Sequence, residues 1–176
     1  MIEERIKAAI RDVPDFPKQG IIFKDIMPIL KDQQLCNDIV DEMIHRLNEK
    51  IDAVLAVESR GFFFGMLLAN KMKLPFVPVR KKGKLPGKTL SVNYDLEYGT
   101  ATVEIHKGMI KEGDNILIHD DLLATGGTAL AAAKLTKMAG AKVSAFAFIV
   151  TLEYLNGLKK LAALNSPIIS LSNYNQ

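Results

Sequence analysis

Two adjacent acids followed by a short glycine-containing loop are the most informative chemical feature of the sequence. Asp120 and Asp121 follow the apolar run 115–119, and a short loop then leads into a helical segment. Glycine lets a backbone turn tightly beside a ligand, while the free N–H groups of a helix start and threonine hydroxyls can bind phosphate. We therefore predict a phosphate site formed by Ala124, Thr125, Gly126, Gly127 and Thr128.

The acid pair narrows the class of ligand. A loop that binds only phosphate would not have two carboxylates beside it, because like charges repel. Carboxylate oxygens do accept hydrogen bonds from sugar hydroxyls. A ribose 5-phosphate fits both halves of the pattern, so we predict that Asp120 and Asp121 bind the 2′- and 3′-hydroxyls of a ribose.

Two further segments carry cations that could bind an anionic part of the ligand, although taken alone they could also be solvated surface residues. Arg60 lies in the segment 58–61 directly after the apolar run 53–57, and its planar guanidinium suits phosphate oxygens. A loop at 80–88 would neutralise and attract an anionic substrate, and it carries Arg80, Lys81, Lys82, Lys84 and Lys88. The segment 83–89 is not a Walker A loop, because it has three residues between its glycines where that motif has four.

Alternating apolar segments predict the scaffold that positions these groups. The runs 53–57, 75–79, 115–119 and 142–150 are typical of buried parallel strands. Helices are predicted at 61–72 and from about 127 to 139, between pairs of these strands. Ligands of such α/β sheets bind at the carboxyl ends of the strands, which is where the loop after 115–119 lies.

The remaining segments add elements around this core. Helical spacing extends over 2–13 and over 32–50, where Asp32 is a candidate N-cap, and 20–26 is predicted to be extended. The runs 89–94 and 100–106 alternate like a hairpin and interrupt the strand–helix alternation, which suggests an active-site lid. A short helix and a strand near 167–171 complete the chain.

Composition excludes several classes of protein. The 176 residues suffice for one domain with a sizeable core, and a net charge of +3 is too small to indicate a nucleic-acid-binding protein. No apolar stretch approaches the ~20 residues of a membrane helix, so we expect no membrane partner. The acidic N-terminal segment does not resemble a signal peptide. Cys36 is the only cysteine, which excludes an internal disulfide and suits a reducing cytoplasm.

The motif HDDLLATGGT at 119–128 resembles the phosphoribosyl pyrophosphate (PRPP) motif of type I phosphoribosyltransferases, and DDLLATGGT is similar to its form in adenine phosphoribosyltransferases. The segments PDFPKQGIIFKDIMPIL, ESRGFFFG, RKKGKLPGKT and YDLEYGT match the same family in order and spacing. This resemblance implies one α/β domain over residues 1–176, with a mainly parallel central sheet flanked by helices. It also implies a hairpin or lid insertion at about 80–106.

The resemblance implies transfer of a phosphoribosyl group from PRPP to adenine, which yields AMP and pyrophosphate. It places the 5-phosphate at Ala124–Thr128, the ribose at the two aspartates and a cis peptide at Glu58–Ser59. The site of the pyrophosphate would comprise Glu58, Ser59, Arg60, Arg80, Lys81 and Lys84.

For the base, the resemblance implicates the extended segment 20–26. Phe23 can stack on adenine, and the backbone of Ile22 and Lys24 can read its polar edge if that strand edge is free, with Leu122 as an opposite wall. The family's mobile glutamate falls on Glu97, which would act on the base as a general acid or base or would stabilise positive charge. Without the resemblance, Phe23 would be taken as a core residue.

The same resemblance implies Mg²⁺ bound mainly to PRPP and water, with few direct protein ligands, and a cytoplasmic homodimer. His45, His106 and His119 are scattered and predict no metal triad, and His119 is expected to be a core residue. Two alternatives remain open at this point. One is transfer to another purine such as xanthine, and the other is a non-catalytic regulator that binds PRPP or a purine.

Overall fold

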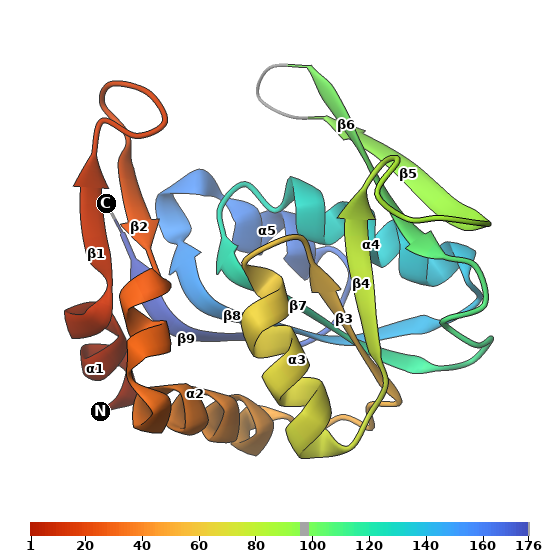
Figure 1. Ribbon diagram of the computed structural model, residues 1–176, viewed down its shortest axis with the longest axis horizontal. Helices are drawn as coiled ribbons and strands as arrows, with labels where there is room; N and C mark the ends of the chain where they lie inside the picture. The colour runs from red at the N-terminus through yellow and green to blue at the C-terminus, as the bar shows by residue number, and fades with distance from the viewer. Residues whose placement is uncertain (96–98, 176) are drawn as a thin grey trace.

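A computed structural model describes residues 1–95 and 99–175. It contains a seven-stranded sheet in the order β5-β6-β4-β3-β7-β8-β9, in which β4, β3, β7, β8 and β9 run parallel (Figure 1). The predicted α/β fold with a mainly parallel sheet is therefore confirmed. The strands are β3 (Ala53–Val57), β4 (Phe76–Lys81), β5 (Thr89–Asp95), β6 (Thr100–His106), β7 (Asn115–Leu123), β8 (Lys142–Leu152) and β9 (Ile168–Tyr174).

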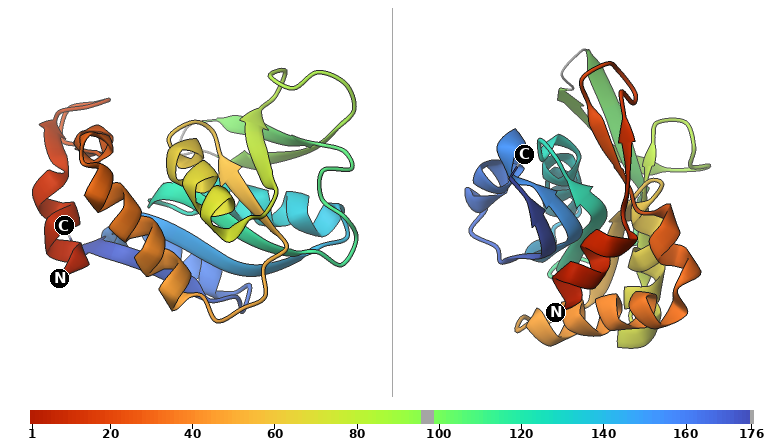
Figure 2. Two further views of the ribbon diagram at one scale, coloured as in Figure 1. Left: turned by 60° about the horizontal axis from the view of Figure 1, so that its bottom comes forward. Right: turned by 90° about the vertical axis from the view of Figure 1, so that its left-hand side faces the viewer.

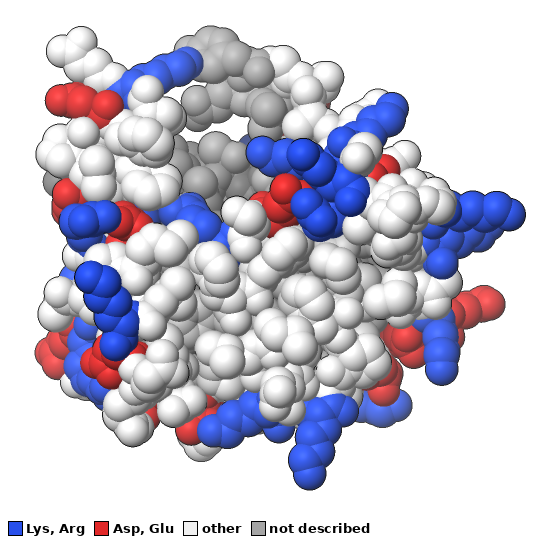
Figure 3. Space-filling view, viewed as in Figure 1, with Lys and Arg blue, Asp and Glu red and all other residues white. Residues whose placement is uncertain are grey.

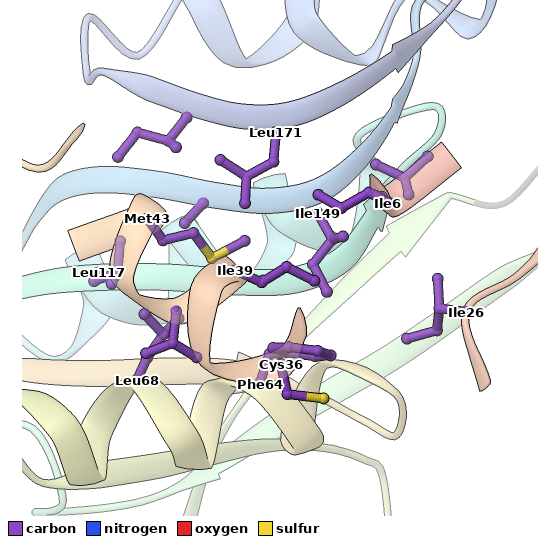
Figure 4. Packing of buried hydrophobic residues seen from close by; sticks show 14 of the residues in the cluster. Ile6, Ile26, Cys36, Ile39, Met43, Phe64, Leu68, Leu117, Ile149 and Leu171 are labelled. Carbon is purple, nitrogen blue, oxygen red and sulfur yellow. The ribbon is translucent and has the colours of Figure 1, made fainter. Parts of the chain in front are cut away.

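Helices cover both faces of the sheet because successive residues of its strands point to opposite sides. On one face, Val54 and Leu117 pack with α1 (Ile2–Ala9), α2 (Gln33–Arg46) and α3 (Gly61–Met72), and Figure 4 shows part of this cluster. Leu55 and Ile118 face the other side, where α4 (Gly127–Met138) and α5 (Gly157–Ala162) pack. Short 3₁₀ helices, η1 (Met27–Lys31) and η2 (Glu153–Leu155), complete the elements.

Local sequence features place the helices next to the sheet. The Asp32 side chain accepts a hydrogen bond of 2.9 Å from the Leu35 N–H and so caps α2, as predicted. Such a cap contributes about 1 kcal/mol. On α3, Gly65 lies directly against the Cβ of Ala56, so any larger residue there would push the helix away from β3.

The N-terminal helix is shorter than predicted. It ends at Ala9, and Arg11–Pro14 forms strand β1, which pairs antiparallel with β2 (Ile22–Asp25). Helical spacing at Ile10 and Val13 was misleading because cross-strand contacts determine the conformation of this segment. The Arg11 guanidinium, for example, donates to Asp25 opposite it, with Nε 3.1 Å from Oδ2.

Strand β7 is longer than predicted. It pairs with β8 as far as Leu123 and Thr151. Asp120 and Asp121 therefore lie within the last residues of the paired strand and not in the loop beyond it. The longer partner strand β8 supplies backbone hydrogen-bonding groups for this extension. The acids are therefore held by the sheet itself, which fixes their backbone more firmly than a loop would.

Two hairpins rise beyond the carboxyl ends of the central strands. The β1–β2 and β5–β6 hairpins lie on either side of this edge, as the views in Figure 1 and Figure 2 agree. The predicted hairpin at 89–94 and 100–106 is confirmed, with Thr89 opposite His106 and Asp95 opposite Thr100. The carboxyl ends of the central strands are thus flanked by two antiparallel hairpins from distant parts of the sequence.

Candidate active site

Three adjoining cavities open at the carboxyl ends of β3 and β7. The smallest, of about 80 Å³, is lined by the whole of Ala124–Thr128 together with Asp120, Leu122 and Phe148. Gly126 has a φ of 79°, which a residue with a side chain rarely adopts. α4 begins at Gly127, so the predicted loop does form the start of a helix, where N–H groups are free to bind an anion.

The two aspartates lie between this loop and a second cavity of about 460 Å³, which we call the anion cavity. Burial raises the pKa of Asp120 well above its ordinary range, and the charge of Asp121 raises it further. Burial also raises the pKa of Asp121, against the opposing effect of the Arg60 cation. Sequence analysis missed Gly61, where a Cβ would lie only 2.8 Å from Oδ1 of Asp120.

Arg60 contacts both the acids and the base-binding segment. Its Nε lies 3.0 Å from Oδ2 of Asp121, and its guanidinium lies over the Phe23 ring, 4.8 Å from the centroid. Nη1 of Arg60 is buried and has no hydrogen-bond partner among the described residues. A guanidinium with a buried free donor, placed in the wall of a cavity, is ready to bind an incoming phosphate oxygen.

The peptide bond between Glu58 and Ser59 is cis, as the family resemblance implied. Both residues line the anion cavity with Lys81. Burial favours a higher pKa for the Glu58 carboxyl, but hydrogen bonds from Nε of Arg80 and the N–H of Lys81, both 2.9 Å long, outweigh it and lower that pKa. Glu58 is therefore an anion that holds the start of the basic loop.

The basic loop is less uniform than its sequence suggests. Lys81 lines the anion cavity, and Arg80 pairs with Glu58, but Lys84 is exposed and lines none of the three cavities. The structure therefore does not bring Lys84 to the site. Glu104, buried on β6, accepts hydrogen bonds from the N–H of Gly83 and from other groups of the loop, and so fixes its path.

The third cavity, of about 630 Å³, is mainly apolar, and we call it the base cavity. All four residues predicted to bind the base line it, namely Ile22, Phe23, Lys24 and Leu122. Its far wall was missed by sequence analysis and consists of Leu152, Tyr154 and Leu155. These residues follow the predicted strand 142–150 without any motif, so only the fold brings them to the cavity.

The Lys24 side chain is directed elsewhere. It is 7% exposed, and its ammonium lies 2.8 Å from Oδ1 of Asp12 and 4.2 Å from the centroid of the Tyr174 ring. This residue can therefore offer only its backbone to a base. No other strand among residues 1–95 and 99–175 pairs with the second edge of β2, so backbone groups on that edge are open to a ligand.

Glu97 lies outside the described residues. The strand that leads to it does approach the phosphate loop, since a Cβ on Gly127 would lie 3.5 Å from the carbonyl oxygen of Asp95 and 3.6 Å from the Tyr94 ring. The end of β5 next to the hairpin turn is therefore adjacent to the start of α4.

His119 is a buried core residue, as expected. Its Nδ1 lies 2.9 Å from the carbonyl oxygen of Ala147, and burial lowers the pKa of its imidazole to about 4. The ring is therefore neutral at neutral pH. Within the described part of the chain, no group of three or more His, Cys, Asp or Glu side chains is placed to hold a metal ion.

Comparison with known proteins identifies the family. Residues 27–163 match the phosphoribosyl transferase domain. The adenine phosphoribosyltransferase of Cytophaga hutchinsonii is 48% identical over 175 residues, which cover 99% of this chain and 97% of the relative. The chain belongs to the adenine phosphoribosyltransferases. The enzyme therefore transfers the phosphoribosyl group of PRPP to adenine, which gives AMP and pyrophosphate.

Solved structures agree with this assignment. The adenine phosphoribosyltransferase of Thermoanaerobacter pseudethanolicus superimposes with a TM-score of 0.94 at 48% identity and covers 99% of this enzyme and 100% of its own chain. The Saccharomyces cerevisiae enzyme, solved with adenine and an imino-altritol bisphosphate, has a TM-score of 0.90 at 38% identity, with coverage of 97% and 98%. The alternatives of a xanthine enzyme and a non-catalytic regulator are thereby set aside. In the described residues, no helix combines the length and apolar character that crossing a bilayer requires.

Proposed function

We propose that the three adjoining cavities bind the three parts of the reacting complex. The 5-phosphate of PRPP would occupy the cavity at Ala124–Thr128, the pyrophosphate would occupy the anion cavity, and adenine would occupy the base cavity. The observation that carries this proposal is that Leu122 and Ala124 line all three cavities. Their shared wall marks the point where base, ribose and leaving group meet.

The chemistry follows from the charges at that point. Displacement of pyrophosphate from C1 by N9 of adenine develops positive charge on the ribose. Asp120 and Asp121 would bind the ribose hydroxyls, and their carboxylates would stabilise this charge in a site largely shielded from water. Arg60 and Lys81 would stabilise the negative charge on the departing pyrophosphate. The positive charge on the ribose and the negative charge on the pyrophosphate develop within one cavity. The groups that stabilise them must therefore lie close together, as the aspartates and Arg60 do.

Adenine would stack on Phe23 and present its edge to the backbone of Ile22 and Lys24. The yeast relative was solved with adenine, which supports a base site in this fold. A 6-oxopurine reverses the hydrogen-bonding sense of the 6-position and N1, and unpaired buried groups would disfavour it by up to about 10⁴-fold. AMP formation from adenine, measured beside hypoxanthine, guanine and xanthine, tests this selectivity, and comparable rates with a 6-oxopurine would contradict it.

Glu97 is proposed to close over the substrates from the lid at about 80–106, on the basis of the motif YDLEYGT at 94–100. We expect Glu97→Gln to lower turnover more than it lowers PRPP affinity, because the carboxylate would act on the base. Glu112→Gln, an exposed glutamate outside the site, is the matched control. Equal turnover of the two variants would remove Glu97 from the mechanism.

The donor set suits Mg²⁺ carried by the substrate. Asp120, Asp121 and Glu58 all line the anion cavity, where they would hold the ion through water while phosphate oxygens bind it directly. When bound, the ion supplies neutralisation of the pyrophosphate charge. Dependence of the turnover of PRPP on added Mg²⁺ is the test.

We propose that the chain is one domain that functions as a cytoplasmic homodimer. Phe63, Met66 and Leu67 on α3 are 40–50% exposed, and Figure 3 shows a broad surface without charged side chains over this helix. Apolar patches of this kind mark protein–protein interfaces. Sedimentation of the wild type and of Met66→Glu tests the proposal, and a monomeric wild type would contradict it. Cys36, the only cysteine, is buried and free, which suits a reducing compartment.

The phosphate assignment has a direct test. Thr128→Val removes one hydroxyl from the loop at nearly constant volume, so we expect the Kd for AMP to rise about tenfold or more, while the Kd for adenine stays unchanged. Thr136→Val makes the same substitution in α4 away from the loop and should leave both constants unchanged. If Thr128→Val leaves AMP binding intact, the 5-phosphate does not lie at this loop.

A further inference from the structure

Helix α5 starts directly against the phosphate loop, with Gly157 facing Gly126. Gly157 is buried, and its φ lies outside the left-handed region, so its backbone conformation does not require glycine. The requirement is for space, because a Cβ on Gly157 would overlap the carbonyl oxygen of Ala124 and lie 3.0 Å from two carbons of Leu123. A Cβ on Gly126 would in turn lie 3.2 Å from the carbonyl oxygen of Gly157.

This contact fixes the direction of one peptide group in the loop. The bond between Ala124 and Thr125 is not among the two cis peptides of the described residues. In a trans peptide the carbonyl oxygen and the following N–H point in opposite directions. Because the Ala124 oxygen faces Gly157, the Thr125 N–H points away from α5. Thr125 lines the phosphate cavity, whereas Gly157 does not.

We propose that Gly157 is a positioning residue for the reaction. By leaving room for the Ala124 carbonyl, it holds the Ala124–Thr125 peptide so that the Thr125 N–H is directed to the 5-phosphate. This inference rests on the proposed binding of the 5-phosphate at Ala124–Thr128. Gly157 itself touches no substrate and acts only through the peptide that it orients.

A side chain at position 157 would displace the loop more readily than the helix. α5 is anchored by Leu161, which is fully buried in the core beneath α4. The strand ladder of β7, in contrast, ends at Leu123, so the Ala124–Thr125 peptide has no partner strand to resist rotation. The added Cβ would therefore turn the peptide and move the Thr125 N–H away from the phosphate.

The test is the Gly157→Ala variant, with affinities measured separately for AMP, adenine and pyrophosphate. We expect the Kd for AMP to rise about 10- to 100-fold, as for loss of a hydrogen bond to a charged group. The Kd values for adenine and pyrophosphate should stay unchanged, because neither ligand carries the 5-phosphate. The KM for PRPP should rise with that for AMP, while the KM for adenine should not.

Two other outcomes would overturn the proposal. A merely structural role predicts that all three affinities fall together with the melting temperature. If position 157 had room for a methyl group, Gly157→Ala would bind AMP normally. It would also melt at the same or a higher temperature, because alanine favours helix formation more than glycine does.

Matched variants separate these outcomes. Gly65→Ala creates a similar overlap, with Ala56 in the core, and should lower the melting temperature without a selective loss of AMP binding. Lys159→Ala alters an exposed residue of α5 and should leave all affinities unchanged. If Gly157→Ala does not fold, Leu161→Val replaces it, because a looser α5 should also weaken AMP binding selectively, and failure to do so would overturn the proposal.

Thr128→Val and Gly157→Ala together distinguish the role of Gly157 from the binding of the 5-phosphate at the loop. Normal AMP binding by Thr128→Val would show that the loop does not bind the 5-phosphate at all. Weak AMP binding by Thr128→Val together with normal binding by Gly157→Ala would refute only the role of Gly157.

Discussion

The base cavity and the anion cavity share a wall but are built in different ways. The base cavity takes apolar side chains from β2, from the end of β7, from the end of β8 and from η2. The anion cavity takes its charged residues from the turn after β3, from the end of β4 and from the end of β7. Charge is concentrated in short motifs, whereas the apolar walls are assembled from distant segments.

This difference indicates that the anion cavity carries out the chemistry, whereas the base cavity serves recognition. The anion cavity carries the two aspartates, whose pKa values are raised because the fold withdraws their carboxyl groups from water. Such arrangements are characteristic of catalytic sites. The base cavity has surface that suits a flat ligand but few groups that could react. Substitutions in the two cavities should therefore affect different kinetic constants.

The largest effect is expected for Asp121→Asn in the anion cavity. Loss of the carboxylate that is proposed to face the ribose should lower kcat by about 10²- to 10³-fold. Steady-state kinetics with saturating PRPP and adenine measure this change, and circular dichroism checks that the variant is folded. Asp114→Asn, directly before the first residue of β7 and so at the other end of that strand, is the control. A variant with normal kcat would show that this carboxylate does not act in catalysis.

Arg60→Ala tests the wall that the two cavities share. Arg60 contacts Asp121 and lies over Phe23, so its loss should raise the KM for both substrates, by about tenfold or more for PRPP. Arg60→Lys keeps the charge but loses the planar donor geometry and should restore PRPP binding only in part. If Arg60→Ala raised the KM for only one of the two substrates, Arg60 would not contribute to both cavities.

Phe23→Ala should affect the base cavity most, although Phe23 also lines part of the anion cavity. Loss of the ring should raise the KM for adenine about tenfold, because stacking and apolar burial are removed together. The KM for PRPP should rise less, because Phe23 affects the anion cavity only by packing against Arg60. Phe16→Ala removes a ring that lies edge-on to Phe23, 5.1 Å away, but does not line the cavity, and it should have a smaller effect. Equal effects of both variants would argue against stacking on Phe23.

Tyr154→Ala tests the far wall of the base cavity, which had no sequence signature. Tyr154 is 45% exposed, so its removal should raise the KM for adenine only a few-fold and leave kcat and the KM for PRPP unchanged. Tyr174→Ala, at an aromatic residue outside the cavity, provides the comparison. A change in the KM for PRPP would contradict the assignment of this wall to the base.

The smallest expected effect is on stability. Because the folded state raises the pKa of Asp120, ionisation of this group disfavours folding. Its penalty is absent below the unfolded pKa of about 3.9 and grows as pH rises toward the raised value. Asp120→Asn should therefore melt a few degrees higher than the wild type at pH 7, and the two should converge near pH 4. An unchanged difference across this range would contradict the raised pKa.

Much of the anion cavity could be predicted from sequence because its residues are adjacent in the chain. Asp120 to Thr128 form a continuous segment that runs from the end of β7 into the start of α4 and lines the anion and phosphate cavities, and their types indicate the ligand directly. The cis bond after Glu58 was implied by family resemblance and is present. Lys84 was predicted at the pyrophosphate from a cluster of cations, which does not reveal which of them line the cavity; in the structure Lys84 lines none of the three cavities.

The base cavity and the strand boundaries were harder to predict. Nothing local distinguishes Leu152 or Tyr154 from core residues, and only the packing of the end of β8 and of η2 brings them into the wall of the base cavity with Phe23. The extension of β7 through Asp121 depends on the length of its neighbour β8, which a local pattern cannot report. The strand at Arg11–Pro14 depends in the same way on pairing with β2.

The central claim is that one nucleotide spans the cavities, with its 5-phosphate at Ala124–Thr128 and its ribose at the aspartates. A crystal structure of the enzyme with AMP tests it most directly. We expect phosphate oxygens within hydrogen-bonding distance of the loop N–H groups, ribose hydroxyls on Asp120 and Asp121, and the base against Phe23. AMP bound elsewhere while the loop holds no phosphate, or bound in the reverse orientation, would contradict it.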